Sequence, residues 1–412
     1  MDPGSRPSKP VDGLRALDGI AILDLTHIAA GPLATSMLGD MGAEVIKVEP
    51  IGRGDPTRGY DDAFPGADSS YFLGLNRSKK SIAVDLKSEA GLGVVHRLLE
   101  RCDVVVENYR PGALRRLGLD YDSVARRKPR VVYCSISAFG ADGPYAERPG
   151  MDIIVQGMSG IMGITGEPGR PPVKVGPPIA DFMGSYLAAY GISLALLARE
   201  RHGIGQLVSI SLLDGQIASL ANYVTGFHVT GKPDGPQGGG HPQLVPYQVF
   251  AVRDGYMIVA CLTEAFWRGM CKAIGMEHLA ADLRFATNAQ RTRHRAELVP
   301  LLSEVFETKT RAEWIALLAA EDVPCGPING LGDAFADPQV RQNRMVERIT
   351  HPRAGTIAVP GVPVKLSATP GRIASPPPLL GEHTAAVMRE LGYSDQAIED
   401  LRLANVVQMP HQ

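Results

Sequence analysis

The sequence predicts an α/β protein whose first half forms a parallel, doubly wound sheet. Short apolar segments rich in β-branched residues recur there, and helical patterns such as residues 32–40 and 90–101 lie between several of them. The predicted strands are residues 20–25, 44–48, 81–85, 104–107 and 130–136. Short buried strands that alternate with helices are typical of a parallel sheet.

Sheets of this kind bind ligands just beyond the carboxyl ends of their strands. Those positions are residues 26–30, 49–54, 108–112 and 137–140, and we expect the binding site among them. No G-x-G-x-x-G fingerprint opens the first helix, and the sequence contains no Walker A motif. Nicotinamide, flavin and nucleoside triphosphate chemistry therefore lack their usual sequence support.

Asp181 is the lone carboxylate between a Pro/Gly-rich lead-in, residues 175–180, and an apolar run over residues 182–198. A proline pair before such a run marks a helix start. Asp181 is therefore expected at or near an N-cap, where backbone N–H groups and the helix dipole favour its charge. A carboxylate there serves either as a cap alone or as a reactive group at the edge of a core. Glycines, serines and tyrosines interrupt the run, which falls short of the ~20 apolar residues that a bilayer needs, so a buried helix is favoured over a membrane span.

The chain is expected to divide into two domains and a tail. Residues 1–10 are polar and Pro/Ser-rich and predict a disordered tail. The first part of a large domain covers residues 11–224, a smaller α+β domain covers residues 225–330, and a return segment covers residues 331–412. The return segment ends with a predicted helix over residues 381–391.

The smaller domain begins with a stretch rich in glycine and proline, residues 231–242, which is a connector or an active-site flap. A strand is predicted over residues 256–262, and helices over residues 264–274, 294–306 and 311–320. Thr310 and Glu313 have the spacing of a capping box for the last helix.

Composition narrows the class of ligand. The 412 residues carry a formal net charge of −2, and the pI is about 6.6, so no basic excess suggests nucleic acid or an anionic membrane surface. Five cysteines lie scattered without metal-ligand spacing, at positions 102, 134, 261, 271 and 325. An odd count without a signal peptide argues against a disulfide framework, and we expect reduced cysteines in a cytoplasmic protein.

Ordered motifs along nearly the whole chain resemble the family III CoA-transferases of the CaiB/BaiF type. They are LGDMGAEVIKVEP at 38–50, GDPTR at 54–58, NRSKKSIAVD at 76–85, VENYRPG at 106–112, SISAFG at 135–140, IADF at 179–182, FATN at 285–288, GPIN at 326–329 and PPPLLG at 376–381. Each motif is weak alone, and their combination in this order is specific.

The resemblance implies a Rossmann-like, CoA-binding large domain that the C-terminal segment completes, a small domain on long linkers, and two chains interlocked as a homodimer. The family's catalytic aspartate falls on Asp181. Its CoA-contacting positions fall on Ile28, Ala29, Leu75, Lys79, Asn108, Tyr109, Arg116 and Ser137. Some relatives carry Gln, Arg and Lys where this chain has Ala29, Pro50 and Ser137.

The implied reaction forms an acyl-aspartyl anhydride at Asp181 and then an aspartyl-CoA thioester, with CoA and acyl-CoA as substrates and with no metal or tightly bound cofactor. Lys79 and Arg116 are expected to hold phosphates, and Tyr109 to offer its face to the base. Each of these also suits a solvated cation or a loop aromatic. Gly238, Gly239, Gly240 and His241 are expected to form an active-site loop that excludes water; a flexible linker is the alternative.

Two other functions share the resemblance. An α-methylacyl-CoA racemase needs a base on each face of the substrate carbon, and the racemases place a histidine where this chain has Met151, although His241 could substitute. The other alternative is a catalytically silent CoA-binding or regulatory protein. A serine-hydrolase interpretation of residues 157–160 is weaker, because the spacing is not G-x-S-x-G.

The substrate is suggested by residues 241–248 and 326–329, which are similar to the succinyl-CoA:glutarate type of transferase. That similarity suggests succinyl-CoA as donor and a dicarboxylic acid as acceptor. A second carboxylate on the substrate would favour a cation in the pocket, and the candidates are Arg53, Arg58 and Arg110. Carnitine-like, aromatic and branched acids are alternatives.

Overall fold

A computed structural model of the chain describes residues 13–410, so the predicted tail over residues 1–10 lies outside the described residues. The chain forms two compact units. The larger unit comprises the residues up to 159, residues 175–226 and the residues from 338 onward; the smaller comprises residues 160–174 and 227–337. Residues 160–174, which the sequence analysis did not set apart, join the smaller unit, where the Gly238 N–H donates to the Gly166 carbonyl at 2.8 Å.

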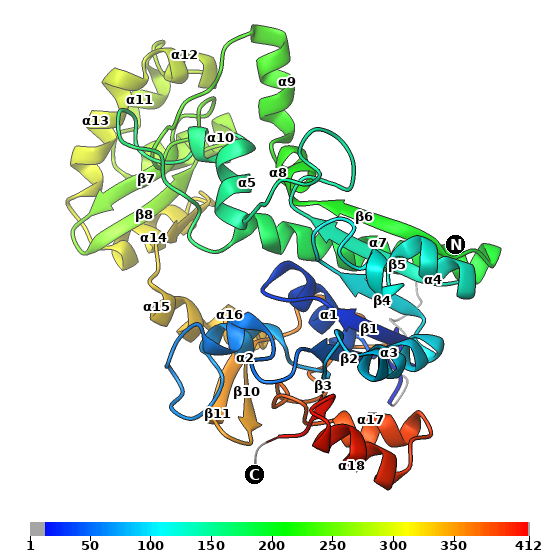
Figure 1. Cartoon of the computed structure of the whole chain (residues 1–412). Coiled ribbons are helices and arrows are strands. Elements are labelled where there is room, and N and C mark those ends of the chain that lie inside the picture. Colours follow the sequence, from blue (N-terminus) through cyan, green and yellow to red (C-terminus); the bar gives the residue numbers. More distant parts are fainter. Residues whose placement is uncertain (1–12, 411–412) are drawn as a thin grey trace, which may run out of the picture. The chain divides into compact units, whose positions relative to one another are not determined.

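The larger unit is built on a seven-stranded sheet with the order β12-β3-β2-β1-β4-β5-β6 (Figure 1). All pairings are parallel except that of β12 with β3. The strands are β1 Ala21–Leu25, β2 Glu44–Glu49, β3 Lys80–Val84, β4 Val104–Glu107, β5 Val132–Ser137, β6 Gln206–Ser211 and β12 Val407–Gln408. The five predicted strands are therefore present, and strand order reverses between β1 and β4, where such sheets place their ligands.

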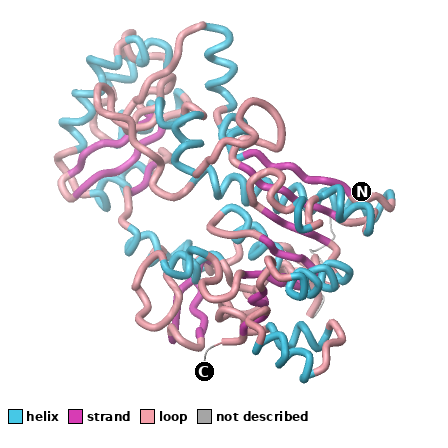
Figure 2. Tube along the Cα trace, viewed as in Figure 1, coloured by secondary structure: helices cyan, strands magenta, loops and turns pink. Residues whose placement is uncertain are grey.

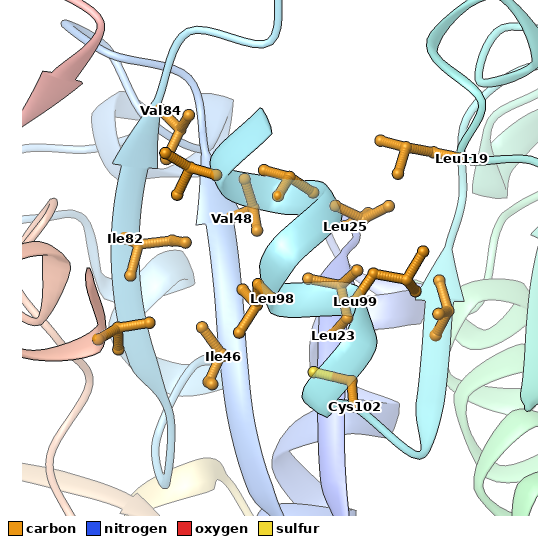
Figure 3. Close-up of a cluster of buried hydrophobic side chains, with 14 of the residues drawn as sticks. Leu23, Leu25, Ile46, Val48, Ile82, Val84, Leu98, Leu99, Cys102 and Leu119 are labelled. Carbon is orange, nitrogen blue, oxygen red and sulfur yellow. The ribbon is translucent and has the colours of Figure 1, made fainter. Parts of the chain in front are cut away.

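Alternate strand residues bury the two faces of this sheet under different helices. On one face, Leu23, Ile46 and Ile82 pack against Leu98 and Leu99 of α3 Glu89–Arg101 (Figure 3). On the other face, strand residues such as Ile22 and Val104 share a core with α1 Ala30–Asp40 and α7 Ile179–His202. The continuous apolar strands of the sequence thus correspond to a sheet covered on both sides.

The long apolar run forms α7, which extends from Ile179 to His202 and ends at Gly203 in the left-handed region, with φ of 73°. Within the part of the chain that the structure describes, α7 is the one helix with the length and hydropathy to span a membrane. It packs instead against α1, β5 and β6. A Cβ on Gly184 would lie 2.3 Å from Leu212, and one on Gly191 would lie 2.6 Å from Val208, so these glycines allow the close contact.

Shorter elements surround this core. They are η1 Pro56–Gly59, α2 Ser70–Leu75, η2 Arg115–Leu117, α4 Tyr121–Arg127, α5 Asp152–Met158, α8 Leu212–Ser219 and the first part of α9 Ala221–Thr230, which continues into the smaller unit after Gly226. The return segment contributes α16 Pro338–Gln342, the hairpin β10 Val346–His351 and β11 Gly355–Pro360, α17 Thr384–Glu390, α18 Asp395–Leu403 and strand β12. Its Gly381 N–H donates to Ser81 Oγ of β3 at 3.0 Å, which ties the C-terminal segment to the sheet.

The smaller unit has a three-stranded antiparallel sheet of β7 Tyr247–Val252, β8 Gly255–Ala260 and β9 Cys325–Pro327 (Figure 2). Its helices are α6 Ile161–Ile164, α10 Glu264–Ala273, α11 His278–Ala281, α12 Asn288–Arg293, α13 Arg295–Phe306, α14 Arg311–Ala319 and α15 Leu331–Ala336. Trp267, Phe306 and Trp314 lie in its core. The capping box of Thr310 and Glu313 is confirmed.

Candidate active site

Asp181 lies in the first turn of α7, three residues after the N-cap Pro178. Its backbone N–H and that of Ala180 donate to Oδ1 of Asp152, at 3.3 and 2.8 Å. The Asp181 carboxylate itself accepts no hydrogen bond and forms no ion pair within residues 13–410. The cap of this helix is therefore Asp152, and the Asp181 carboxylate has no partner among the residues that the structure describes.

The charge of Asp181 is disfavoured in this environment. Burial, and after it the nearby Asp152 carboxylate, together raise the pKa of the Asp181 carboxyl to about 7. The expectation that the helix start favours the charge of Asp181 is therefore wrong, because desolvation and a like charge outweigh the helix dipole, whose first N–H groups Asp152 occupies. A carboxylate of this kind changes its charge near neutral pH.

Tyr71 of α2 is a site residue that the sequence did not indicate. Burial raises the pKa of its phenol to about 12, with Asp181 as the next cause and Tyr60 and Asp152 after it. The rings of Tyr60 and Tyr71 lie 5.5 Å apart. Because the phenol keeps its proton, Tyr71 can donate a hydrogen bond close to Asp181. No periodicity or motif in the sequence marks it for this role.

A buried network of charges lies under the carboxyl ends of β1, β2 and the loop before β3. Lys47 Nζ pairs with Asp55 Oδ2 at 2.9 Å, and Lys79 Nζ pairs with Asp24 Oδ2 at 3.1 Å; all four side chains lack exposed surface. Burial lowers the pKa of Lys79 to about 8. Burial opposes the charge of Asp24, yet Lys79 and Lys47 hold its pKa well below the usual range.

The Lys79 ammonium is therefore paired with protein groups and not with solvent. Its ammonium also donates to Asn76 Oδ1 at 2.9 Å. The surface-cation alternative for Lys79 is excluded by this burial, and its expected contact with a phosphate stays a prediction that requires the ion pair to rearrange. Arg116, the other predicted phosphate ligand, is exposed on η2.

Ile28 and Ala29 lie in the loop between β1 and α1, next to Asn108. Ile28 has φ of +69°, which is a strained conformation for a β-branched residue. Asn108 accepts from the His27 N–H at 2.9 Å and donates to the His27 carbonyl at 2.8 Å, and the His27 ring contacts Tyr109 with centroids 5.1 Å apart. The structure thus brings four predicted CoA contacts together at the point where strand order reverses.

Ser137 lines a cavity of about 370 Å³ that residues of β5 and β6 and of the segment after β4 enclose. Its lining mixes apolar residues with polar ones, and the polar ones include Glu107, Arg110, Arg115, Asp120, Ser135 and Ser209. Burial raises the pKa of the Glu107 carboxyl. Arg115 rather than Arg116 contacts the cavity. Leu75, the last predicted CoA contact, is buried at the end of α2, where its carbonyl accepts from Ser36 Oγ at 2.7 Å.

The three arginines that are candidates for binding a second substrate carboxylate differ in burial and in their partners. Arg58 is buried, pairs with Glu49 and Asp68 at 2.7 Å each, and lies 3.7 Å from the centre of the Phe72 ring. Its donors are occupied by these partners and by the Pro378 carbonyl. Arg53 is exposed, and Arg110 lies at the cavity, so these two are the candidates that can reach a ligand without breaking a buried ion pair.

The glycine-rich segment 238–241 belongs to the smaller unit and is attached to β7. The N–H of Val249 donates to the Gly239 carbonyl at 3.1 Å, and the His241 N–H donates to the Tyr247 carbonyl at 2.9 Å. A Cβ on Gly239 would lie 2.5 Å from Val249 Cγ2, and Gly238 has φ of +60°. Arg295 Nη2 donates to the His241 carbonyl at 2.5 Å. Burial, and then Arg295, lower the pKa of the His241 imidazole. These contacts argue against a free linker.

Comparisons with known proteins agree with one another. A sequence model described as CoA-transferase family III matches residues 17–384. The succinyl-CoA:glutarate CoA-transferase of Mus musculus is 41% identical over 405 residues, which are 98% of this chain and 93% of that protein. The succinate–glutarate CoA-transferase of Agrobacterium fabrum is 40% identical, over 91% of this chain and 95% of that protein. The crystal structure of a CaiB/BaiF family protein from Brucella suis has a TM-score of 0.83 and 40% identity, covering 92% of this chain and 100% of that one.

Proposed function

Because this chain belongs to CoA-transferase family III, we propose that it transfers CoA from succinyl-CoA to a dicarboxylic acid of the size of glutarate, with Asp181 as the nucleophile. The observation that carries the assignment of Asp181 is its carboxylate, which is partly buried, has no protein partner within the described residues, and has a pKa raised to about 7. Such a group is ionised at slightly alkaline pH and is not committed to a structural contact. Both properties suit a nucleophile.

The proposed reaction balances without a further reactant. An oxygen of Asp181 attacks the thioester carbonyl, the C–S bond breaks, and CoA thiolate leaves from a mixed anhydride. The thiolate attacks the aspartyl carbonyl of the anhydride, which releases the donor acid and leaves an aspartyl-CoA thioester. The acceptor carboxylate attacks that thioester, and the thiolate then attacks the acceptor side of the new anhydride. The product is the new acyl-CoA, and Asp181 returns as a carboxylate.

CoA is proposed to bind along the strand ends of the larger unit. Support comes from the cluster of Ile28, Ala29, Asn108 and Tyr109 and from the cavity that Ser137 lines. Lys79 supports this region through its ion pair with Asp24, beneath the loop that carries Ile28. Arg116 remains the proposed exposed contact for a phosphate.

The dicarboxylate specificity is supported by the relatives named above, two of which carry glutarate in their names. Arg110 is the proposed partner of the second carboxylate, because its guanidinium lies at a cavity and Arg58 is occupied by buried ion pairs. The segment of Gly238, Gly239, Gly240 and His241 remains the proposed active-site loop. Its attachment to β7 fixes the backbone of the segment, as a group that excludes water from an anhydride would need.

The interlocked homodimer is also a proposal. Tyr186, Tyr190, Leu194 and Leu197 form a stripe along α7 and are 48, 63, 47 and 46% exposed. Their spacing of three and four residues puts them on one helix face, and a stripe of this size suits contact with a second copy. Sedimentation equilibrium of the purified chain tests this proposal.

The proposed cytoplasmic location is supported by five free cysteines, four of them buried.

The function is tested by incubating the protein with pairs of acyl-CoA donors and free acids and measuring new thioesters by mass spectrometry. We expect glutaryl-CoA from succinyl-CoA and glutarate, and no product with Asp181→Ala. Asp214→Asn is the matched control, since Asp214 is an exposed first-turn aspartate of the neighbouring α8. Solvent deuterium entering a 2-methylacyl-CoA without exchange of any acid would support the racemase alternative. Met151 is 56% exposed and has no titratable group for that reaction.

A further inference from the structure

Asp152, the first residue of α5, connects this helix to the start of α7 directly and to Val175 through Gln156. Oδ1 accepts from the N–H groups of Ala180 and Asp181 at 2.8 and 3.3 Å. Oδ2 accepts from Gln156 Nε2 at 2.7 Å, and Gln156 Oε1 in turn accepts from the Val175 N–H at 2.9 Å. Gln156 has no exposed surface. Both ends of the Pro/Gly-rich segment before α7, residues 175–180, are therefore held by hydrogen bonds to α5.

This arrangement replaces an ordinary N-cap. Pro178 stands at the N-cap of α7 and supplies no side-chain hydrogen bond. The free N–H groups of a helix start normally stabilise a carboxylate in the first turn. Here Asp152 accepts from two of them, so they are withheld from the Asp181 side chain. The same contacts hold the backbone of Asp181 in place.

We propose that Asp152 is a positioning residue for the transfer reaction, which orients Asp181 by accepting its backbone N–H and places a second carboxylate at the helix start beside it. The inference rests on the proposed function, because it assumes that Asp181 is the nucleophile. A more basic carboxylate is the stronger nucleophile once it is ionised, by the Brønsted relation that also governs thiolates.

The surroundings of Asp181 leave Asp152 as its main charged neighbour. Among residues 13–410, Asp152 is the one charged group that raises the pKa of Asp181, after burial. Tyr71 of α2 is protonated. The other titratable groups on α7 and on the elements packed against it are Asp40 of α1, paired with Arg77; Tyr133 and Cys134 of β5, both buried with raised pKa values; Asp214 of α8, exposed; and Tyr186, Tyr190, Arg199, Glu200, Arg201 and His202 of α7.

The test separates the charge of Asp152 from its hydrogen bonds to the start of α7. Asp152→Asn removes the charge and keeps an oxygen for the N–H groups of Ala180 and Asp181, while its amide NH2 replaces the oxygen that accepts from Gln156 Nε2. The measurement is kcat/KM as a function of pH, with the donor and acid that react fastest in the assay above. We expect the acid-side midpoint of this profile to lie about one pH unit lower than in the wild type. The plateau at high pH should fall about threefold, since a Brønsted coefficient near 0.5 links one pKa unit to that factor. Asp152→Ser, an uncharged N-cap residue, is expected to give the same shift and replaces the first variant if that one fails to fold.

Asp152→Ala removes both the charge and the N–H acceptor, and its plateau should fall more than about tenfold because Asp181 loses its fixed position. Asp214→Asn should leave the profile unchanged. A midpoint and plateau for Asp152→Asn equal to those of the wild type would overturn the proposal and reduce Asp152 to a helix cap. Transfer activity that persists in Asp181→Ala would instead refute the proposed function, so the two failures are distinguishable.

Discussion

Lys79 donates to Asp24 across 3.1 Å in a region where neither side chain has exposed surface. The residues are 55 positions apart in the chain, and the pair joins the end of β1 to the loop before β3. Removal of one partner from a buried pair leaves an uncompensated charge. The pair is therefore a structural connection within the region proposed to bind CoA.

For Lys79→Met we expect a loss of about 3–5 kcal/mol in the free energy of unfolding, measured by urea denaturation. Arg116→Ala should leave that free energy within about 0.5 kcal/mol of the wild type, since the side chain is exposed. Its effect should instead be a rise of about tenfold in KM for the acyl-CoA. A stable Lys79→Met variant with a raised KM would assign Lys79 to phosphate binding rather than to support of the loop.

The stability of the protein should depend on pH through Asp181. Its folded pKa is raised to about 7, above that of an unfolded aspartate. The folded state therefore binds the proton more tightly, and the contribution of Asp181 to stability falls as pH rises between about 4 and 7. Asp181→Asn should be about 1–3 kcal/mol more stable than the wild type at pH 8 and equal to it near pH 4. Urea denaturation at both pH values checks this, and a destabilised Asn variant at pH 8 would contradict the raised pKa.

The same pKa predicts the activity profile. Asp181 must be ionised to attack, so kcat/KM should rise with pH through a midpoint near 7 and level off above it. Initial rates between pH 5 and pH 9 in constant ionic strength measure this. A midpoint near 4 would show that the carboxylate is stabilised as an anion in the free enzyme.

Arg110 and Arg58 should differ in their effect on substrate choice. Arg110→Ala is expected to raise KM for glutarate about 10- to 100-fold and to leave a monocarboxylic acid of similar length unaffected, since the loss is one charge-assisted hydrogen-bonded pair. Arg58→Ala should unfold more easily, because Glu49 and Asp68 lose their partner. Arg53→Ala tests the remaining candidate. Unchanged discrimination in Arg110→Ala would reject the assignment of Arg110.

The glycine-rich segment offers a matched pair of substitutions. A Cβ on Gly239 would lie 2.5 Å from Val249, whereas a Cβ on Gly235 meets nothing within 4 Å. If the segment acts in the reaction, Gly239→Ala should lower kcat more than about tenfold and raise the ratio of thioester hydrolysis to transfer, while Gly235→Ala has no effect. Equal kinetics for both variants would favour the connector alternative.

Elements with strong local sequence patterns could be predicted from the sequence. The five apolar strands, the long apolar helix and the capping box of Thr310 are local features, and the order of the motifs identified the family. Strand β6 was not predicted, although its inward residues Val208 and Ile210 alternate with the exposed Leu207 and Ser209 in a pattern typical of a half-buried strand. Strand β12 was missed because it has two residues and gains its place from pairing with β3.

Charge environments could not be predicted in the same way. The raised pKa of Asp181 depends on Asp152, 29 residues earlier, and the burial of Arg58 depends on partners that include the Pro378 carbonyl, 320 residues later. Such partners are set by the tertiary fold. Residue type and spacing indicated which side chains could react. Only the packing of the folded chain showed which of these side chains are not already held in ion pairs or hydrogen bonds.

The most direct measurement of the central claim is mass spectrometry of peptides from protein mixed with succinyl-CoA in the absence of acceptor and rapidly quenched. We predict a CoA adduct on the peptide that contains Asp181, which disappears when glutarate is added and is absent from Asp181→Ala. An adduct on another residue, or full transfer activity with no adduct on Asp181, would contradict the account.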